Sequence, residues 1–192
     1  MSSNKAKNLA VLSLVALTTL SSCAYHVNQY SPSASNVKIM TEQELGKFNL
    51  SEFTSSKPGL KSIMCRAAGP IEAPNGETYE QYVHNALISE LTLANLLDEN
   101  AMINLQGKLE AINFNSNIGG GKWMISLSFT NGHEMMRIDS EYPFESYFVA
   151  DKACQKVAQS FEPAVQKAIS EVVGNPQFKK LLHASKVSSR TQ

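Results

Sequence analysis

The segment that ends in Asn131-Gly132 predicts both a β-strand and the strand with which it pairs. Residues 123–130 read WMISLSFT, in which Trp, Ile, Leu and Phe alternate with Met, Ser and Thr. Such alternation is typical of a strand with one buried face, and Asn-Gly is the strongest short signal for a two-residue hairpin turn. A two-residue turn places Leu127 opposite Met136, so that apolar side chains meet on one face. The segment therefore predicts an antiparallel hairpin inside a sheet.

Two long helices are expected on either side of this hairpin. The first covers 78–98 and opens with Thr78 and Gln81 at the spacing of a capping box. The second covers 151–173, with Asp151 as its cap, and contains Pro163, where a kink or a break is expected. In both helices, apolar residues recur at steps of three and four, so they form one apolar stripe along the helix surface.

Three further strands complete the predicted sheet, over 60–69, 103–114 and 142–149. In the second of them the apolar parity changes between Leu109 and Ile112, which predicts a β-bulge. Because neither helix can bury its stripe alone, both are expected to pack on the sheet. The sequence predicts an α+β two-layer sandwich, with a mostly antiparallel sheet of 4–5 strands, two main helices on one face, and the order β-α-β-β-β-α.

The N-terminal residues carry a different signal. Two lysines precede the apolar run LAVLSLVALTTL at 9–20, and LSSC ends at Cys23. The run is too short for a membrane-spanning helix and fits the core of a signal peptide. The four features together resemble the lipobox of bacterial lipoproteins. The resemblance implies cleavage before Cys23, a diacylglyceryl group on its thiol and a further acyl chain, such as palmitate, on the new amino terminus. The alternative is a simple secretory signal with an incidental cysteine.

The lipobox resemblance also implies a location and a division of the chain. Ala24 stands where Asp would favour the inner membrane, so we expect the periplasmic face of the outer membrane of a Gram-negative bacterium. We expect a signal peptide over 1–22, a lipidated Cys23 with a flexible tether over 23–40, a single domain over 41–185 and a frayed tail over 186–192.

The order of elements from about residue 78 to residue 184 resembles the YajG-like family of bacterial outer-membrane lipoproteins. The resemblance rests on the lipobox, the hairpin sequence ISLSFTNGHEMM, the aromatic strand YPFESYF and the long helix that closes with NPQFKKLL. That family has no assigned activity. The resemblance therefore implies a fold and a location, and no catalytic residue.

Two cysteines remain once Cys23 is lipidated. An even number of thiols in an oxidising compartment suggests a disulfide between Cys65 and Cys154. The first expected strand and the last long helix would be neighbours in the sandwich, which makes the pairing geometrically possible. The alternative is two buried free thiols, which often act as small apolar side chains.

No residue pattern indicates a reaction, a metal or a cofactor. The four histidines are His26, His84, His133 and His183, and they lie on separate segments without a ligand spacing. The GGGK sequence at 119–122 is followed by a strand and not by the helix of a phosphate-binding loop. The 17 basic and 17 acidic residues balance, so no nucleic-acid partner is expected.

Met124 and Met135 are the residues that suggest a contact surface. Methionine is soft and adaptable, and Met124 is expected on the outer face of the sheet. We therefore expect a lipid-anchored, non-enzymatic protein that acts as an interaction or envelope-assembly accessory, held at the membrane by Cys23 and bound to a protein partner. The alternative is a carrier of a small apolar ligand or lipid, with a pocket between sheet and helices near Trp123 and Leu127. A hydrolase would need a catalytic cluster that no motif displays.

Overall fold

The computed structural model describes residues 24–183, so the predicted signal peptide, Cys23 and the tail lie outside the described residues. A five-stranded sheet forms one layer of the molecule, and its main strands are antiparallel. They are β6 (Asn104–Asn115), β7 (Gly121–Thr130) and β8 (Met135–Phe144).

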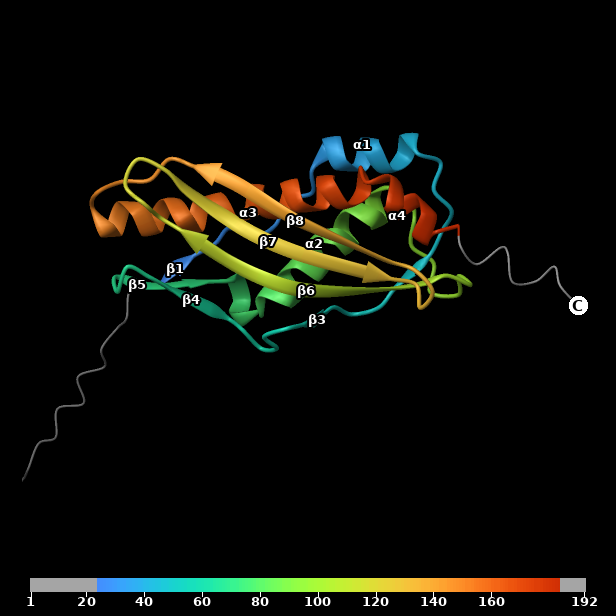
Figure 1. Cartoon of the computed structure of the whole chain (residues 1–192), viewed down its shortest axis with the longest axis horizontal. Coiled ribbons are helices and arrows are strands. Elements are labelled where there is room, and N and C mark those ends of the chain that lie inside the picture. The colour runs from blue at the N-terminus through green and yellow to red at the C-terminus, as the bar shows by residue number, and fades with distance from the viewer. Residues whose placement is uncertain (1–23, 184–192) are drawn as a thin grey trace, which may run out of the picture.

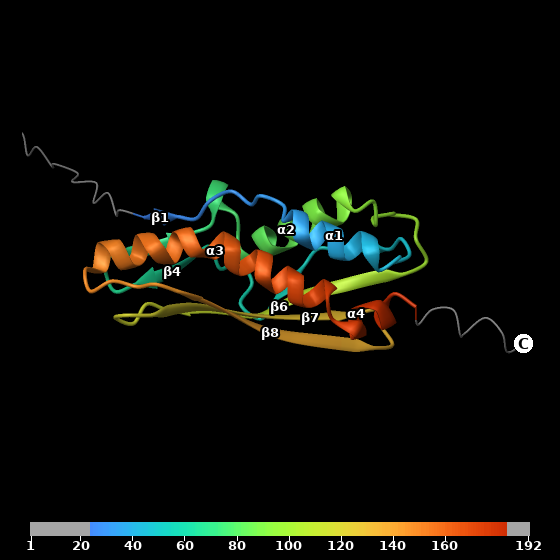
Figure 2. The same ribbon diagram turned by 90° about the horizontal axis from the view of Figure 1, so that it is seen from above.

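Two long helices cover one face of this sheet (Figures 1 and 2). They are α2 (Tyr79–Leu93) and α3 (Ala150–Val173). The predicted fold class is therefore confirmed. The capping box at the start of α2 is confirmed as well: the Thr78 hydroxyl accepts from the backbone N–H of Gln81, whose side chain accepts from the N–H of Thr78.

The turn of the β7–β8 hairpin is longer than predicted. Leu127 pairs with Ile138 and not with Met136, a shift of two residues that leaves every side chain on its expected face. A two-residue type I′ turn needs positive φ at both central residues, and of the two only Gly132 has it, at 89°. Instead, Oδ1 of Asn131 accepts from two later backbone N–H groups, both at 2.9 Å, and closes a turn over residues 131–134.

The bulge predicted in β6 is confirmed, because its pairing with β7 shifts between Leu109 and Ala111. The strand predicted over 60–69 is wrong in part. It divides into β4 (Ser62–Cys65) and β5 (Gly69–Glu72), because Arg66 adopts a φ of 46° and the chain turns back there. These two strands and β1 (Tyr25–His26) form a separate three-stranded sheet.

The strand predicted over 142–149 is also wrong. Residues 142–144 continue β8, and a loop follows until α3 begins. Pro143 is tolerated there because β8 is an edge strand. The cap of α3 is Val149 without a side-chain hydrogen bond, so Asp151 lies in the first turn instead, and α3 continues through Pro163 as one helix.

Four short elements complete the fold. The strands β2 and β3 both pair in parallel with β6, the 3₁₀ turn η1 precedes α2, and the short helix α4 follows α3. Their bounds are Asn49–Leu50 for β2, Thr54–Ser55 for β3, Pro74–Gly76 for η1 and Pro176–Leu181 for α4.

The predicted disulfide is present between Cys65 and Cys154, with the Cα atoms 5.9 Å apart. It joins the end of β4 to the second turn of α3, and both residues are fully buried. The bridge therefore fixes the small three-stranded sheet to the helix layer. The chain between the two cysteines spans 89 residues, a separation at which a cross-link is expected to restrict the unfolded chain strongly.

The flexible tether expected over 23–40 is wrong for the residues that the structure describes. Val27 is buried, and its backbone N–H donates to the carbonyl oxygen of Glu72 at 3.0 Å. Helix α1 (Ala34–Glu42) begins after Ser33, whose hydroxyl caps it. The helix packs against both α2 and α3, and its Met40 side chain is fully buried.

A buried carboxylate explains why this segment docks. Glu90 lies on α2 with no exposed surface, and its Oε1 accepts hydrogen bonds from the Tyr30 hydroxyl, the Ser33 N–H at 2.9 Å and Asn36 Nδ2 at 3.3 Å. Asn36 Nδ2 also donates to the Gln166 carbonyl on α3 at 2.9 Å. Burial, and then the hydrogen bond to Glu90, raise the pKa of Tyr30 well above its ordinary value. The carboxylate thus supplies the acceptor that orders residues 30–36.

Replacement of Glu90 by Ala is expected to lower the free energy of unfolding by about 3 kcal/mol, because three donors lose their buried acceptor. The half-buried Glu162, which accepts from Asn28 and Ser31 of the same segment, offers a matched control. Glu162→Ala is expected to cost less than about 1 kcal/mol. Urea unfolding and limited proteolysis within residues 25–42 measure the difference. Equal effects of the two variants would contradict the role given to Glu90.

Candidate functional site

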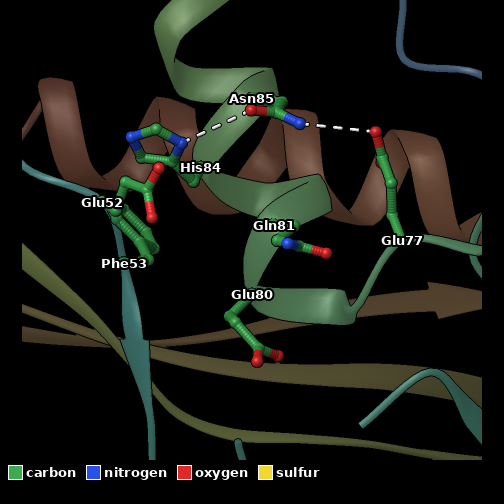
Figure 3. Close-up of a pocket in the computed structure, with 7 residues that line it drawn as sticks. All are labelled: Glu52, Phe53, Glu77, Glu80, Gln81, His84 and Asn85. Carbon is green, nitrogen blue, oxygen red and sulfur yellow. Dashed lines mark hydrogen bonds between the residues drawn. The ribbon is translucent and has the colours of Figure 1, made fainter. Parts of the chain in front are cut away.

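A polar hollow of about 230 Å³ lies between the chain that leads into β3 and the first half of α2 (Figure 3). It combines carboxylates, amides and one imidazole. Its lining residues are Glu52, Phe53, Glu77, Glu80, Gln81, His84 and Asn85.

The position of Phe53 forms one wall of this hollow. The aromatic ring lies directly over Gly107 of β6, where a Cβ atom would come within 2.1 Å of it. Gly107 is therefore required for close approach of the ring to the sheet. The same ring contacts His84, with the ring centroids 5.4 Å apart.

Glu80 forms the floor of the hollow and is 8% exposed. Its Oε1 accepts from the Gly59 N–H at 2.8 Å, while its Oε2 is buried and has no partner among the described residues. Such an atom normally has a partner, and a water molecule that enters the hollow could supply it.

The other polar groups do not form a catalytic pair. His84 Nδ1 lies 3.4 Å from Oδ1 of Asn85, whose Nδ2 donates to Glu77 at 3.4 Å. The carboxylates of Glu52, Glu77 and Glu80 point in different directions (Figure 3). Residues 24–183 contain no group of three His, Cys, Asp or Glu side chains that could hold a metal ion. The hollow thus offers hydrogen-bond acceptors, without an acid paired to a base.

The remaining histidines do not converge on this hollow. His26 lies in β1, where its Nδ1 is 3.9 Å from a carboxylate oxygen of Glu72. His133 is exposed in the β7–β8 turn, and His183 follows α4 at the last described position. These three positions belong to separate parts of the described fold.

The two methionines predicted as a partner surface lie on one face of the sheet but far apart. Met135 is 72% exposed and pairs with Thr130, whereas Met124 is half-buried and pairs with Glu141. Six residues of β7 separate these pairs, which is about 20 Å at the rise of a strand. The structure therefore does not bring Met124 and Met135 into a single patch.

Polar side chains occupy the sheet face between the methionines and beside Met124. Arg137 pairs with Asp139 at 3.0 Å, and Lys122 pairs with Glu141 at 2.7 Å. The hydrogen bond from Arg137 lowers the pKa of Asp139. The charged side chains on this face are paired with one another. Such a face suits a polar partner better than an apolar one.

The bulge in β6 places Glu110 at the centre of a second polar group. The carboxylate accepts from Lys108 Nζ and from the Ser128 hydroxyl, both at 2.7 Å. These two hydrogen bonds, with a third from Ser56, outweigh partial burial and lower the pKa of Glu110 to about 2. The irregularity in the strand thus positions a strongly held carboxylate.

The buried carboxylates on α2 were missed by sequence reasoning, although the spacing contained a signal. Glu80, Val83, Leu87 and Glu90 follow one another at steps of three, four and three residues, so both acids lie on the buried stripe of α2. An acid on an apolar stripe indicates a buried acceptor, which here serves Gly59 and the segment before α1.

No family model matches the chain, and no curated protein matches it significantly. Among solved structures, an uncharacterized protein is 8% identical with a TM-score of 0.43, and the match covers 78% of this chain and 99% of the other. A candidate lipoprotein from Caulobacter crescentus CB15 is 12% identical with a TM-score of 0.37, with 80% and 98% covered. Values this low assign neither a family nor a function. The resemblance to the YajG-like family stays a prediction.

Within residues 24–183, no helix combines sufficient length with sufficient apolar character to cross a bilayer.

Replacement of Glu110 by Gln is expected to change the pH dependence of stability. Because the folded-state pKa lies near 2 and the ordinary value is 4.5, the carboxylate stabilises the fold at pH above 4.5 and loses this effect as the pH falls toward 2. The stability difference between the native chain and the variant should therefore shrink over that window. Urea unfolding at a series of pH values measures this difference. Lys108→Gln should bring the folded-state pKa of Glu110 closer to its ordinary value, and so narrow the pH range over which the stabilisation is lost. A difference in unfolding free energy that stays constant across these pH values would refute the role given to Glu110.

Proposed function

We propose that this chain is a lipid-anchored lipoprotein of the cell envelope, attached through Cys23 at the periplasmic face of the outer membrane of a Gram-negative bacterium. Its domain acts as a non-enzymatic interaction or assembly accessory, which requires no cofactor and binds no nucleic acid. The lipobox resemblance at residues 1–23 supports the anchor.

One observation supports the proposal further: within the described residues the first strand begins at Tyr25, two residues after Cys23. Two residues span at most about 7 Å. A lipid on Cys23 would therefore hold the domain directly at the bilayer, in place of the long tether that the sequence suggested. Confinement of this kind raises the effective concentration of the domain for any partner in the same membrane.

The alternative function, a carrier with a pocket between sheet and helices, receives little support from the packing. The indole ring of Trp123 is fully buried and contacts the rings of Tyr79, Phe114 and Phe161, with centroids 4.7 to 6.4 Å away. Its Nε1 donates to the Val157 carbonyl at 2.9 Å. Side chains fill the space that an apolar ligand would occupy there.

The anchor is tested by comparison of the native chain with Cys23→Ser. We expect the native chain in the membrane fraction, with intact mass showing cleavage before Cys23 and the added acyl groups. The variant is expected to leave the membrane fraction. Cys65→Ala with Cys154→Ala is the control, because it removes the other two cysteines and leaves the anchor intact. An unmodified Cys23 thiol in the native chain would refute the proposal.

The accessory role is tested by in-cell crosslinking from a photoreactive residue at position 135, which is exposed on the sheet face. The same photoreactive side chain placed at position 124, which is half-buried, is the comparison. We expect a crosslink to a membrane-associated protein that disappears in the Cys23→Ser background, because the partner encounter depends on confinement. Crosslinks of equal yield with and without the anchor would contradict the mechanism.

A further inference from the structure

We propose that one end of the domain is a membrane-contacting tip that rests on the lipid surface beside the anchor. The tip consists of five exposed apolar side chains: Met64, Ile118, Tyr147, Phe148 and Val149. This inference rests on the lipid anchor proposed for Cys23. It adds an orientation and a second, non-covalent membrane contact.

The tip residues are unusually exposed for their type. Phe148 is 80% exposed, Ile118 is 68% and Met64 is 63%, while Val149 and Tyr147 are about half exposed, at 54% and 43%. Single exposed apolar residues are ordinary, but a group of large ones at one end of a domain marks a contact with another molecule or with a membrane.

Arg66 holds the three loops of the tip together. Its Nε donates to the Ser116 hydroxyl at 2.9 Å, and its Nη1 donates to the carbonyl oxygens of Tyr147 at 2.8 Å and Phe148 at 3.2 Å. The Ser146 hydroxyl in turn donates to the Ser116 carbonyl at 3.0 Å.

Each apolar side chain of the tip therefore lies within two residues of a group bonded in this network. Tyr147 and Phe148 accept from Arg66 directly, Val149 follows them, Met64 precedes Arg66 by two positions and Ile118 follows Ser116 by two. The five side chains therefore belong to segments that one hydrogen-bond network holds together at this end of the molecule.

The start of the fold lies at the same end of the molecule as the tip. The Tyr25 hydroxyl donates to Oδ1 of Asp151 at 2.9 Å, two residues beyond Val149. β1 pairs with β5, which pairs with β4, the strand that carries Met64. Figure 1 shows β1, β4, β5 and the start of α3 together at one end, with α4 at the other. The first described residues thus lie next to the tip, and Cys23 immediately precedes them in the sequence.

The rim of the tip has the chemistry of a membrane interface. Lys152 and Lys156 stand one turn apart on α3 and line, with Tyr147, a polar hollow of about 300 Å³. Apolar side chains that enter the acyl boundary, a tyrosine at headgroup level and lysines near anionic phosphates are the features of an interfacial contact. Glu145 is an exposed acid on the same loop, so the tip is not uniformly basic.

The test uses the lipidated full-length mature chain in vesicles of phosphatidylethanolamine and phosphatidylglycerol that contain brominated lipid. A fluorophore is attached at Phe148→Cys and, as the matched control, at Met102→Cys. Met102 is 88% exposed and lies just before β6, at the opposite end of the sheet from the β6–β7 turn. Only the new thiol reacts, because Cys65 and Cys154 are bridged and Cys23 carries the lipid.

The label at position 148 is expected to lose most of its emission to the brominated lipid, and the label at position 102 to keep it. Replacement of Ile118 and Val149 by Ser should reduce the loss at position 148. Equal emission at both positions, with Cys23 shown by mass to be lipidated, would overturn the tip and leave the proposed function in place. A label that reacts with Cys23 itself would show that the anchor is absent and would overturn both proposals.

Discussion

A single buried carboxylate decides where this domain begins. Glu90 has no exposed surface, and its Oε1 accepts hydrogen bonds from Tyr30, Ser33 and Asn36. A buried carboxylate is costly without such donors, and polar groups just before α1 and in its first turn supply them to Oε1, whereas Oε2 has no partner among the described residues. The segment therefore belongs to the fold, and α1 rests on α2 and α3 because this acceptor and the apolar Met40 hold it there.

The docking of this segment controls the geometry of the whole N-terminal end. Once residues 30–36 are fixed, β1 is directed along β5, and the disulfide between Cys65 and Cys154 ties that small sheet to α3. The small sheet and the start of α3 then lie together at one end of the described residues (Figure 1). A lipid placed two residues before Tyr25 would orient such a domain, whereas a lipid on a long coil would only confine it.

The parts of the fold that depend on local patterns could be predicted, and the parts that depend on distant partners could not. The capping box at Thr78, the bulge near Glu110 and the faces of β7 and β8 follow from periodicity and turn chemistry. The register of the hairpin was missed because the Asn131 side chain closes a longer turn than its dipeptide suggests. The docked segment was missed because its acceptor, Glu90, lies more than 50 residues away. The hollow near Glu80 was missed because it forms only when Phe53 crosses Gly107.

Native-state hydrogen exchange at the Val27 amide tests most directly whether the segment that follows Cys23 is docked on the fold, as the proposed orientation requires. This N–H donates to the Glu72 carbonyl at 3.0 Å and the Val27 side chain is buried, four positions after Cys23. Protection close to that of the central amides of β7 is expected, because the segment should open only when the docked helices open with it. Exchange at the rate of an unstructured peptide would contradict the docking, and with it the proposed orientation of the domain at a membrane.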